Sequence, residues 1–195
     1  MRTLIVTELV TIDGVIDSPG GGDHPHAGWT FKDVAFDEAA YEIKGREQKE
    51  SGALLVGAQS WREFHEIWPT MEADFAHYNA MPKYVVSTTL SDAEIAESPW
   101  QPMTLLRSVE DVKVLKEAAT DEEAGGPIIV HGSARLAQSL AAADLVDRYH
   151  LLVFPVLLGS GKKLFVDQAE KQQLRVVESQ TYDNGVTKLV LEVKR

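Results

Sequence analysis

Short runs of branched apolar residues recur along the first two thirds of the chain, with more polar segments between them. Buried strands of a parallel sheet have this continuous apolar character, because helices cover both of their faces. The runs lie at Thr3–Val10, Ala53–Val56, Tyr84–Ser87, Met103–Leu106 and Ile128–Val130. The segments between them favour helices, which we expect at Val34–Ser51, from Ser60 onward, from Glu110 to about Ala119, and at Ser133–Ala143. This alternation predicts β-α-β units.

The last third of the chain has a different pattern. Strands are expected at Arg148–Val156, Leu174–Tyr182 and Val186–Val193, with a loop over Pro155–Lys163. Asp183-Asn184-Gly185 predicts a tight hairpin, because an Asn-Gly pair accepts the positive φ of such a turn. We therefore predict an α/β fold whose central sheet is mixed and mostly parallel, with antiparallel C-terminal strands. No repeat or linker divides the sequence, so residues 1–195 are expected to form a single domain.

Composition excludes several classes of protein. The 195 residues carry a formal net charge of −11 and contain no basic cluster, so we expect neither a nucleic-acid partner nor long-range attraction of anions. No apolar run approaches the roughly 20 residues of a membrane span, and the N-terminus has the pattern of a strand, not of a signal peptide. Cysteine is absent, which excludes disulfides and thiolate catalysis. A cytoplasmic location is the default expectation.

Two segments in which a glycine joins a strand to a helix are candidate ligand-binding positions. The first is Val56-Gly57-Ala58 and the second is Val130-His131-Gly132-Ser133. Ligands of open α/β sheets bind beyond the carboxyl ends of the strands, where the helix N-terminus presents unpaired N–H groups. A glycine there lets the backbone approach a pyrophosphate closely. The alternative is that each glycine is only a turn residue.

Other well-known binding and catalytic motifs are absent or incomplete. No G-x-G-x-x-G follows a strand, and no G-x-S-x-G elbow is present. Gly159-Ser160-Gly161-Lys162 is not a P-loop, because Lys163 stands where Ser or Thr is required. Asp23-His24-Pro25-His26 has no further ligand at a supporting distance in the sequence, so no metal site is predicted.

Three segments carry a resemblance to a known family. They are Val130–Leu136, Leu145–Tyr149 and, most specifically, Pro155–Phe165 with its Pro-x-x-x-Gly-x-Gly-x-x-Leu-Phe pattern. Together they resemble the C-terminal reductase domain of the riboflavin pathway, a dihydrofolate-reductase-like family. The resemblance covers essentially the whole chain. It implies a three-layer dihydrofolate-reductase-like fold, NADPH as the cofactor and, frequently, a homodimer.

The resemblance also implies positions for the cofactor. The cofactor-binding residues would be Gly57, Ala58, Gln59, Ser60, Ser87, Thr88, Gly132, Ser133, Ala134, Arg135 and Leu136. Relatives often carry Arg where this chain has Ala58, which removes a phosphate partner and weakens the case for NADPH over NADH. Hydroxyls of Ser60 and Ser87 are the expected substitutes.

Substrate-side residues are also suggested by the resemblance. Asp33 matches a buried carboxylate that supports proton delivery, or else it caps the helix expected from Val34. Trp29 could pack on a flat ring of the substrate. Asp13 either reaches the substrate or forms an Asx turn with Gly14. His131 either points toward the ligand or is a satisfied core histidine.

The function predicted from this resemblance is an NADPH-dependent reductase of a small nitrogen heterocycle, a pterin or a compound like 5-amino-6-ribosylaminouracil. The alternative is a non-catalytic, nucleotide-binding dimeric module. Val186, Leu189, Leu191 and Val193 occupy both faces of the last strand, so a homodimer is expected to cover one of them. A helix of the same chain is the alternative cover.

Overall fold

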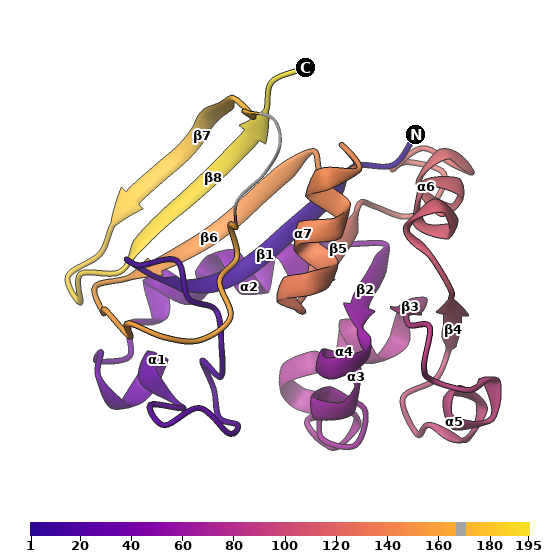
Figure 1. Cartoon of the computed structure of the whole chain (residues 1–195), viewed down its shortest axis with the longest axis horizontal. Helices are drawn as coiled ribbons and strands as arrows, with labels where there is room; N and C mark the ends of the chain where they lie inside the picture. The colour runs from indigo at the N-terminus through magenta and orange to yellow at the C-terminus, as the bar shows by residue number, and fades with distance from the viewer. Residues whose placement is uncertain (167–170) are drawn as a thin grey trace. The chain divides into compact units, whose positions relative to one another are not determined.

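The structure is a computed structural model that describes residues 1–166 and 171–195 (Figure 1). The strands are β1 (Leu4–Thr11), β2 (Ala53–Gly57), β3 (Lys83–Val86), β4 (Met103–Leu106), β5 (Ile128–His131), β6 (Arg148–Phe154), β7 (Leu174–Thr181) and β8 (Thr187–Val193). The helices are α1 (Trp29–Lys32), α2 (Glu38–Glu50), α3 (Ala58–Phe64), α4 (Glu72–Ala80), α5 (Asp92–Glu97), α6 (Val109–Glu117) and α7 (Ala134–Ala142), with a 3-10 turn η1 (Trp68–Thr70).

The strands form one mixed sheet in the order β4-β3-β2-β5-β1-β6-β8-β7. Pairs β4-β3, β3-β2 and β2-β5 are parallel, and pairs β6-β8 and β8-β7 are antiparallel. This topology confirms the predicted mixed α/β fold, which is dihydrofolate-reductase-like. Contacts divide the chain into two compact units: unit 1 contains Met1–Val6 and Lys44–Val146, and unit 2 contains Thr7–Ile43 and Asp147–Arg195.

Unit 1 contains the parallel strands β2 to β5. Strands β2 and β5 are buried almost throughout, which explains their continuous apolar sequence. Aromatic side chains of α3, η1 and α4 pack on Leu54, Val56 and Ile129 and form one core cluster; these rings are Trp61, Phe64, Trp68, Phe75 and Tyr78. The cluster fixes the helices that follow the strand ends.

Unit 2 contains the antiparallel strands β6, β8 and β7. Its core includes Trp29, Leu152, Phe154 and Val190. The predicted hairpin joins β7 to β8, but only Gly185 has a positive φ, of 82°. The Gly185 N–H donates to the Tyr182 carbonyl, so the turn holds three residues, of which glycine takes the left-handed position.

Two helix starts differ from the sequence expectation. Helix α2 begins at Glu38, not near Val34, because Asp33 follows the separate short helix α1 at its C-terminal end. The Asp37 carboxylate accepts a hydrogen bond from the Ala39 N–H at 2.9 Å, which is the interaction of an N-cap. Helix α3 begins at Ala58, two residues before Ser60. Helix α2 therefore starts directly after its capping residue Asp37, whereas helix α3 starts directly after Gly57.

A search of the described residues finds no helix of the length and apolar character that a membrane span requires. Within the same residues, no group of three or more His, Asp or Glu side chains is arranged to hold a metal ion.

Candidate nucleotide site at the strand ends of unit 1

The carboxyl ends of the parallel strands lie at one edge of unit 1. In the register of the sheet, Gly57 stands beside Val86, and Val86 stands beside Leu106. On the other side of β2, Leu55 stands beside Val130, one residue before His131. The residues that follow these strands are therefore neighbours in space, as the sequence predicted for Gly57, Ser87 and Gly132.

The two glycine turns interlock. A Cβ at Gly57 would lie 2.2 Å from the Ser133 Oγ, and a Cβ at Gly132 would lie 2.3 Å from the Ser60 Oγ. Each glycine thus leaves space that the serine of the other turn occupies. Gly132 also has a φ of +66°, a conformation that side chains disfavour. A side chain at either glycine would therefore displace the serine hydroxyl of the other turn, a constraint that a turn alone does not impose.

The starts of α3 and α7 lack side-chain caps. Gly57 has no side chain, and the Ser133 side chain makes no capping hydrogen bond to α7. The first N–H groups of a helix have no partner within the helix, and a phosphate oxygen satisfies them well. The backbone of the Gly132 turn and the Ser60 and Ser133 hydroxyls therefore form a cradle of neutral donors.

Among the other predicted residues of the two turns, some side chains are buried and others are exposed. Ala134 and Leu136 are buried on the inner face of α7, so only their backbone can serve a ligand. Arg135 is exposed in the first turn of α7. The Gln59 amide donates to the Glu63 carboxylate at 2.8 Å on the surface of α3.

A tight turn follows β3. The buried Ser87 Oγ accepts hydrogen bonds from the N–H groups of Thr89 and Leu90, at 3.1 and 3.0 Å. This pairing folds the chain back, and it leaves Thr88 and Thr89 exposed at the rim of the strand ends. Ser87 therefore shapes the turn, and Thr88 is the more accessible of the two predicted residues.

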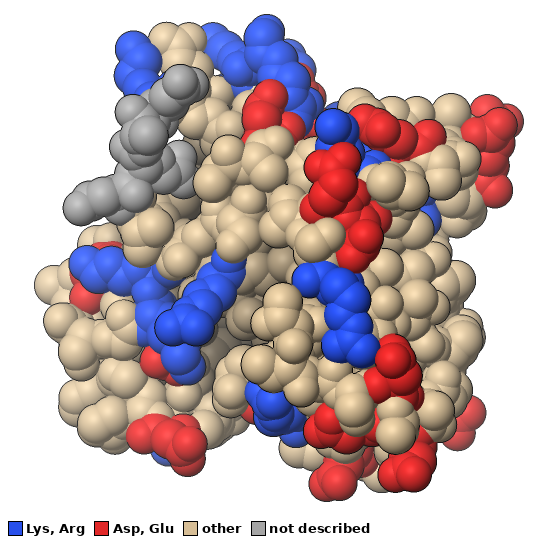
Figure 2. Space-filling view, turned by 45° about the vertical axis from the view of Figure 1, so that its right-hand side comes forward, with Lys and Arg blue, Asp and Glu red and all other residues tan. Residues whose placement is uncertain are grey.

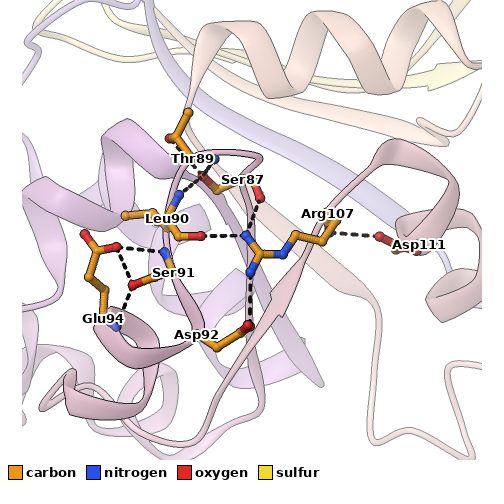
Figure 3. Close-up of polar contacts among 8 residues, drawn as sticks. All are labelled: Ser87, Thr89, Leu90, Ser91, Asp92, Glu94, Arg107 and Asp111. Carbon is orange, nitrogen blue, oxygen red and sulfur yellow. Dashed lines mark hydrogen bonds and ion pairs between the residues drawn. The ribbon is translucent and has the colours of Figure 1, made fainter.

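Arg107, which the sequence analysis did not select, reaches across this turn (Figure 3). Its Nη1 donates to the Leu90 carbonyl at 2.5 Å and lies 3.5 Å from the Ser87 carbonyl. Its Nη2 donates to the Asp92 carboxylate at 3.1 Å. Arg107 is the residue immediately after β4 and precedes the Ser108 cap of α6. The sequence signal for it was therefore a third strand end followed by a helix start.

Two acidic side chains beside Arg107 belong to helix caps. Glu94 accepts from the Ser91 N–H, and Asp111 accepts from the Arg107 and Ser108 N–H groups (Figure 3). These backbone hydrogen bonds lower the pKa of both carboxyls. Since the carboxylates sit at helix N-termini, the partial positive charge there offsets part of their negative charge.

His131 lies in an aromatic box. Its ring meets those of Trp68, Tyr78 and Phe64 edge to face, with centroids 5.3, 5.8 and 6.3 Å away. Burial, together with the Lys44 charge, lowers the pKa of His131 to about 4. The imidazole is therefore neutral at pH 7. This environment favours the core-histidine interpretation that the sequence left open.

In unit 2, Asp13 fastens two loops to each other. Its carboxylate accepts from the Thr11 hydroxyl at 2.5 Å and from the Gly159 and Leu158 N–H groups at 2.7 and 3.3 Å. These hydrogen bonds, the Thr11 hydroxyl first, lower the pKa of Asp13. The Asp17–Lys162 ion pair at 3.2 Å ties the same loops. Asp13 is thus committed to loop structure.

Trp29 and Asp33 lie elsewhere in unit 2 than the resemblance implied. Trp29 is 0% exposed, packs edge to face on Phe154, and donates its indole N–H to the Asp17 carbonyl at 2.9 Å. Neither face of the indole ring is accessible to a substrate. The expected role of Trp29 in substrate binding is therefore wrong. Asp33 is exposed at the end of α1, which corrects both the buried carboxylate and the N-cap expected there.

Charge on the surface is mixed. On the face shown in Figure 2, Lys and Arg side chains stand among Asp and Glu side chains, with wide uncharged areas between them. On this face, therefore, the basic side chains do not form one broad patch.

The sequence matches the family model of the RibD C-terminal domain over residues 2–188. The chain belongs to this family. The match extends over almost all of both units, and it confirms the resemblance on which the expectations for the site were based.

The chain is also similar to individual proteins along most of its length. The Bacillus subtilis (strain 168) protein YyaP, itself uncharacterized, is 26% identical over 97% of this chain and 94% of its own length. A Shewanella sp. PV-4 protein assigned to riboflavin biosynthesis superposes with a TM-score of 0.71 at 20% identity over all of both chains. Acinetobacter baumannii RibD superposes with a TM-score of 0.64 at 15% identity, over all of this chain and 58% of that one. A Corynebacterium diphtheriae pyrimidine reductase-like protein gives 0.64 at 12% identity, over 100% and 92% of the two chains. These structures establish the fold.

Proposed function

We propose that this protein is an NADPH-dependent reductase of a small nitrogen heterocycle, either a pterin or a compound like 5-amino-6-ribosylaminouracil. The observation that carries the proposal is the interlocked pair of glycine turns, Gly57 with Ser133 and Gly132 with Ser60, at the strand ends of a RibD C-terminal domain. Such an edge suits a dinucleotide pyrophosphate.

The residues present fit the cofactor. The backbone of the Gly132 turn and the uncapped start of α7 would hold the pyrophosphate, with the Ser60 and Ser133 hydroxyls beside it. Thr88, Thr89 and Arg107 would lie at the adenosine end. When bound, the nicotinamide supplies a hydride for an electron-poor carbon. The chain's own contribution is to hold and orient the dinucleotide.

On the substrate side, the proposal rests on neither Trp29 nor Asp33. Asp13 contributes through position, because its carboxylate holds the backbone of Leu158 and Gly159. A carboxyl whose pKa is lowered by three hydrogen bonds is ionised at pH 7 and is a poor proton donor. We therefore assign Asp13 to loop positioning.

The test combines binding and turnover. Titration of NADPH fluorescence measures affinity, and absorbance at the nicotinamide band measures oxidation with a panel of pterins and ribosylaminopyrimidines. Saturable binding with oxidation of the cofactor by one of these compounds supports the reductase. Saturable binding without turnover favours the second candidate, a nucleotide-binding module, which Ala58 in place of a phosphate-binding Arg supports. Absence of binding overturns both.

We also propose a homodimer formed through the C-terminal strands. Val190 is 2% exposed and packs in the core of unit 2, so it is not the residue that meets a partner. Leu191 lies on the opposite face of β8, beside Tyr149 and Val176 in the sheet register, and Val176 is 58% exposed. Light scattering should give twice the 21.5 kDa chain mass, and Leu191→Asp should halve it. A wild-type mass of one chain contradicts the dimer.

A further inference from the structure

We propose that Arg107 makes this protein select NADPH over NADH, by binding the 2′-phosphate that only NADPH carries. The inference rests on the proposed function and concerns the adenosine end of the same site. Residue 58, directly after Gly57, is alanine, so the first glycine turn itself supplies no guanidinium. Arg107 brings a guanidinium to the same edge from a different strand.

The sheet register places Arg107 at this edge. Val86 pairs with Leu106, and the Ser87 N–H donates to the Leu106 carbonyl at 2.9 Å. The residues that follow these two strands therefore emerge side by side. Because Gly57 pairs with Val86, the glycine turn that would hold the pyrophosphate is one strand away from the Ser87 turn.

The Arg107 side chain is held at one end and accessible at the other. Its Nη1 is anchored by the Leu90 carbonyl, while the side chain as a whole is 46% exposed. A guanidinium has five N–H donors, and the described residues occupy Nη1 and one position of Nη2. The Nε–H is left for a ligand, and displacing Asp92 from Nη2 would free the second donor of a two-pronged phosphate contact. Thr88 and Thr89 are exposed in the same turn, and the Thr89 hydroxyl lies 3.3 Å from the Ser87 hydroxyl.

The acidic neighbours leave room for an anion. Glu94 and Asp111 are hydrogen-bonded to helix N-termini and are not paired with the Arg107 guanidinium. Asp92 is paired with it, but the Asp92 side chain is 88% exposed, and exposed ion pairs are weak. A phosphate with almost two charges competes well with one solvated carboxylate. Asp92 therefore weakens the site without blocking it.

Another cation near this end offers a rival explanation. Arg62 lies one helical turn after Ala58 on α3 and is close enough to Glu94 to lower the pKa of that carboxyl. Arg62 is thus the residue most able to replace Arg107 in the role proposed here, and the experiment compares the two directly.

The experiment measures dissociation constants for NADPH, NADH and adenosine 2′,5′-bisphosphate by fluorescence and calorimetry. Arg107→Ala should weaken NADPH and the bisphosphate about tenfold and NADH less than about twofold. Arg107→Lys, which keeps the charge and loses the two-pronged geometry, should fall between. Asp92→Asn should tighten NADPH binding by removing the competing carboxylate. The matched control is Lys113→Ala, which removes one cation that is also 46% exposed and also paired with a carboxylate.

The outcomes are distinguishable. Equal losses for NADPH and NADH in Arg107→Ala mean that Arg107 only supports the turn, and they overturn the inference. Loss of the preference in Arg62→Ala but not in Arg107→Ala assigns it to Arg62 and also overturns the inference. A wild-type protein that binds NADPH and NADH equally overturns it while the proposed reductase stands. A wild-type protein that binds neither refutes the proposed function itself.

Discussion

The loops that follow strands are built differently in the two units. In unit 1, a Cβ at Gly57 or Gly132 would collide with a serine hydroxyl of the neighbouring turn. In unit 2, a Cβ at Gly14 or Gly159 would meet nothing within 4 Å. The first pair of glycines is constrained by contact between turns, and Gly132 is constrained also by its positive φ of +66°. The second pair is required only by local backbone conformation, with φ values of +82° and +74°.

The hydrogen bonds made by loop side chains also differ between the two units. In unit 2 the loops are fastened by charges, since Asp13 and Asp17 accept from loop N–H groups and Lys162. In unit 1 the starts of α3 and α7 have no side-chain cap. Loops whose donors are already paired serve as structure, whereas unpaired donors at a helix start suit an anion. The contrast supports the proposal that the turns of unit 1 bind an anion, whereas the loops of unit 2 are held by their own side chains.

The largest effect is expected from Gly132→Val. The new side chain meets Ser60 and occupies the place where backbone would contact the pyrophosphate, so NADPH affinity should fall about tenfold or more. Gly159→Val is the control, because it carries similar backbone strain at φ +74° without a collision. It should lower the unfolding temperature and leave NADPH affinity intact. Unchanged affinity in a folded Gly132→Val protein would remove the pyrophosphate from this turn.

A rescue experiment sharpens the distinction between contact and conformation. Gly57→Ala should lower the free energy of unfolding by about 1–3 kcal/mol, because its Cβ meets the Ser133 Oγ. Ser133→Ala removes that oxygen and should restore most of the loss, since Gly57 has an ordinary φ of −83°. Gly132→Ala should not be restored by Ser60→Ala, because the strain of φ +66° remains. Denaturant unfolding measures all four variants. Equal rescue at both sites would contradict the interlock as described.

A pH effect is expected in unit 1. The folded pKa of His131 is about 4, below its ordinary value of 6.5, so the unfolded chain binds the proton first as the pH falls. Stability from this group is therefore complete above pH 6.5 and decreases toward pH 4, by at most about 3 kcal/mol over that window. In His131→Gln the decrease should be smaller by that amount. His26→Gln, which replaces an exposed histidine, is the control and should follow the wild type.

The smallest effect is expected from Asp13→Asn in unit 2. Weaker hydrogen bonds to Gly159 and Thr11 should reduce the free energy of unfolding by about 1 kcal/mol or less, because the carboxylate is well solvated. The folded pKa of Asp13 is lowered, so this contribution is present above pH 3.8 and is lost as the pH falls below it. Asp23→Asn, an exposed change of the same charge, should have no effect. A larger loss in Asp23→Asn than in Asp13→Asn would refute the loop clamp.

Local patterns in the sequence determined the strands, the hairpin and the two glycine turns. Continuous apolar runs such as Ala53–Val56 and Ile128–Val130 predict buried parallel strands, because both faces of such a strand must be covered. The glycines before Ala58 and Ser133 are visible for the same reason, since a strand, a glycine and a helix start are consecutive in the chain. Signals of this kind depend on near neighbours, so no tertiary structure is needed to detect them.

Tertiary structure alone decided what the side chains of the candidate site contact. Asp13 pairs with Gly159 across 146 positions, and Trp29 is buried by residues of distant strands such as Phe154. Arg107 reaches the Ser87 turn because β4 pairs with β3 in one particular register. Register and packing arise from the whole core at once, and a residue's partners follow from them. The sequence therefore predicted the two glycine turns at the strand ends, while only the folded chain showed that Arg107 contacts the Ser87 turn and that Asp13 holds a loop.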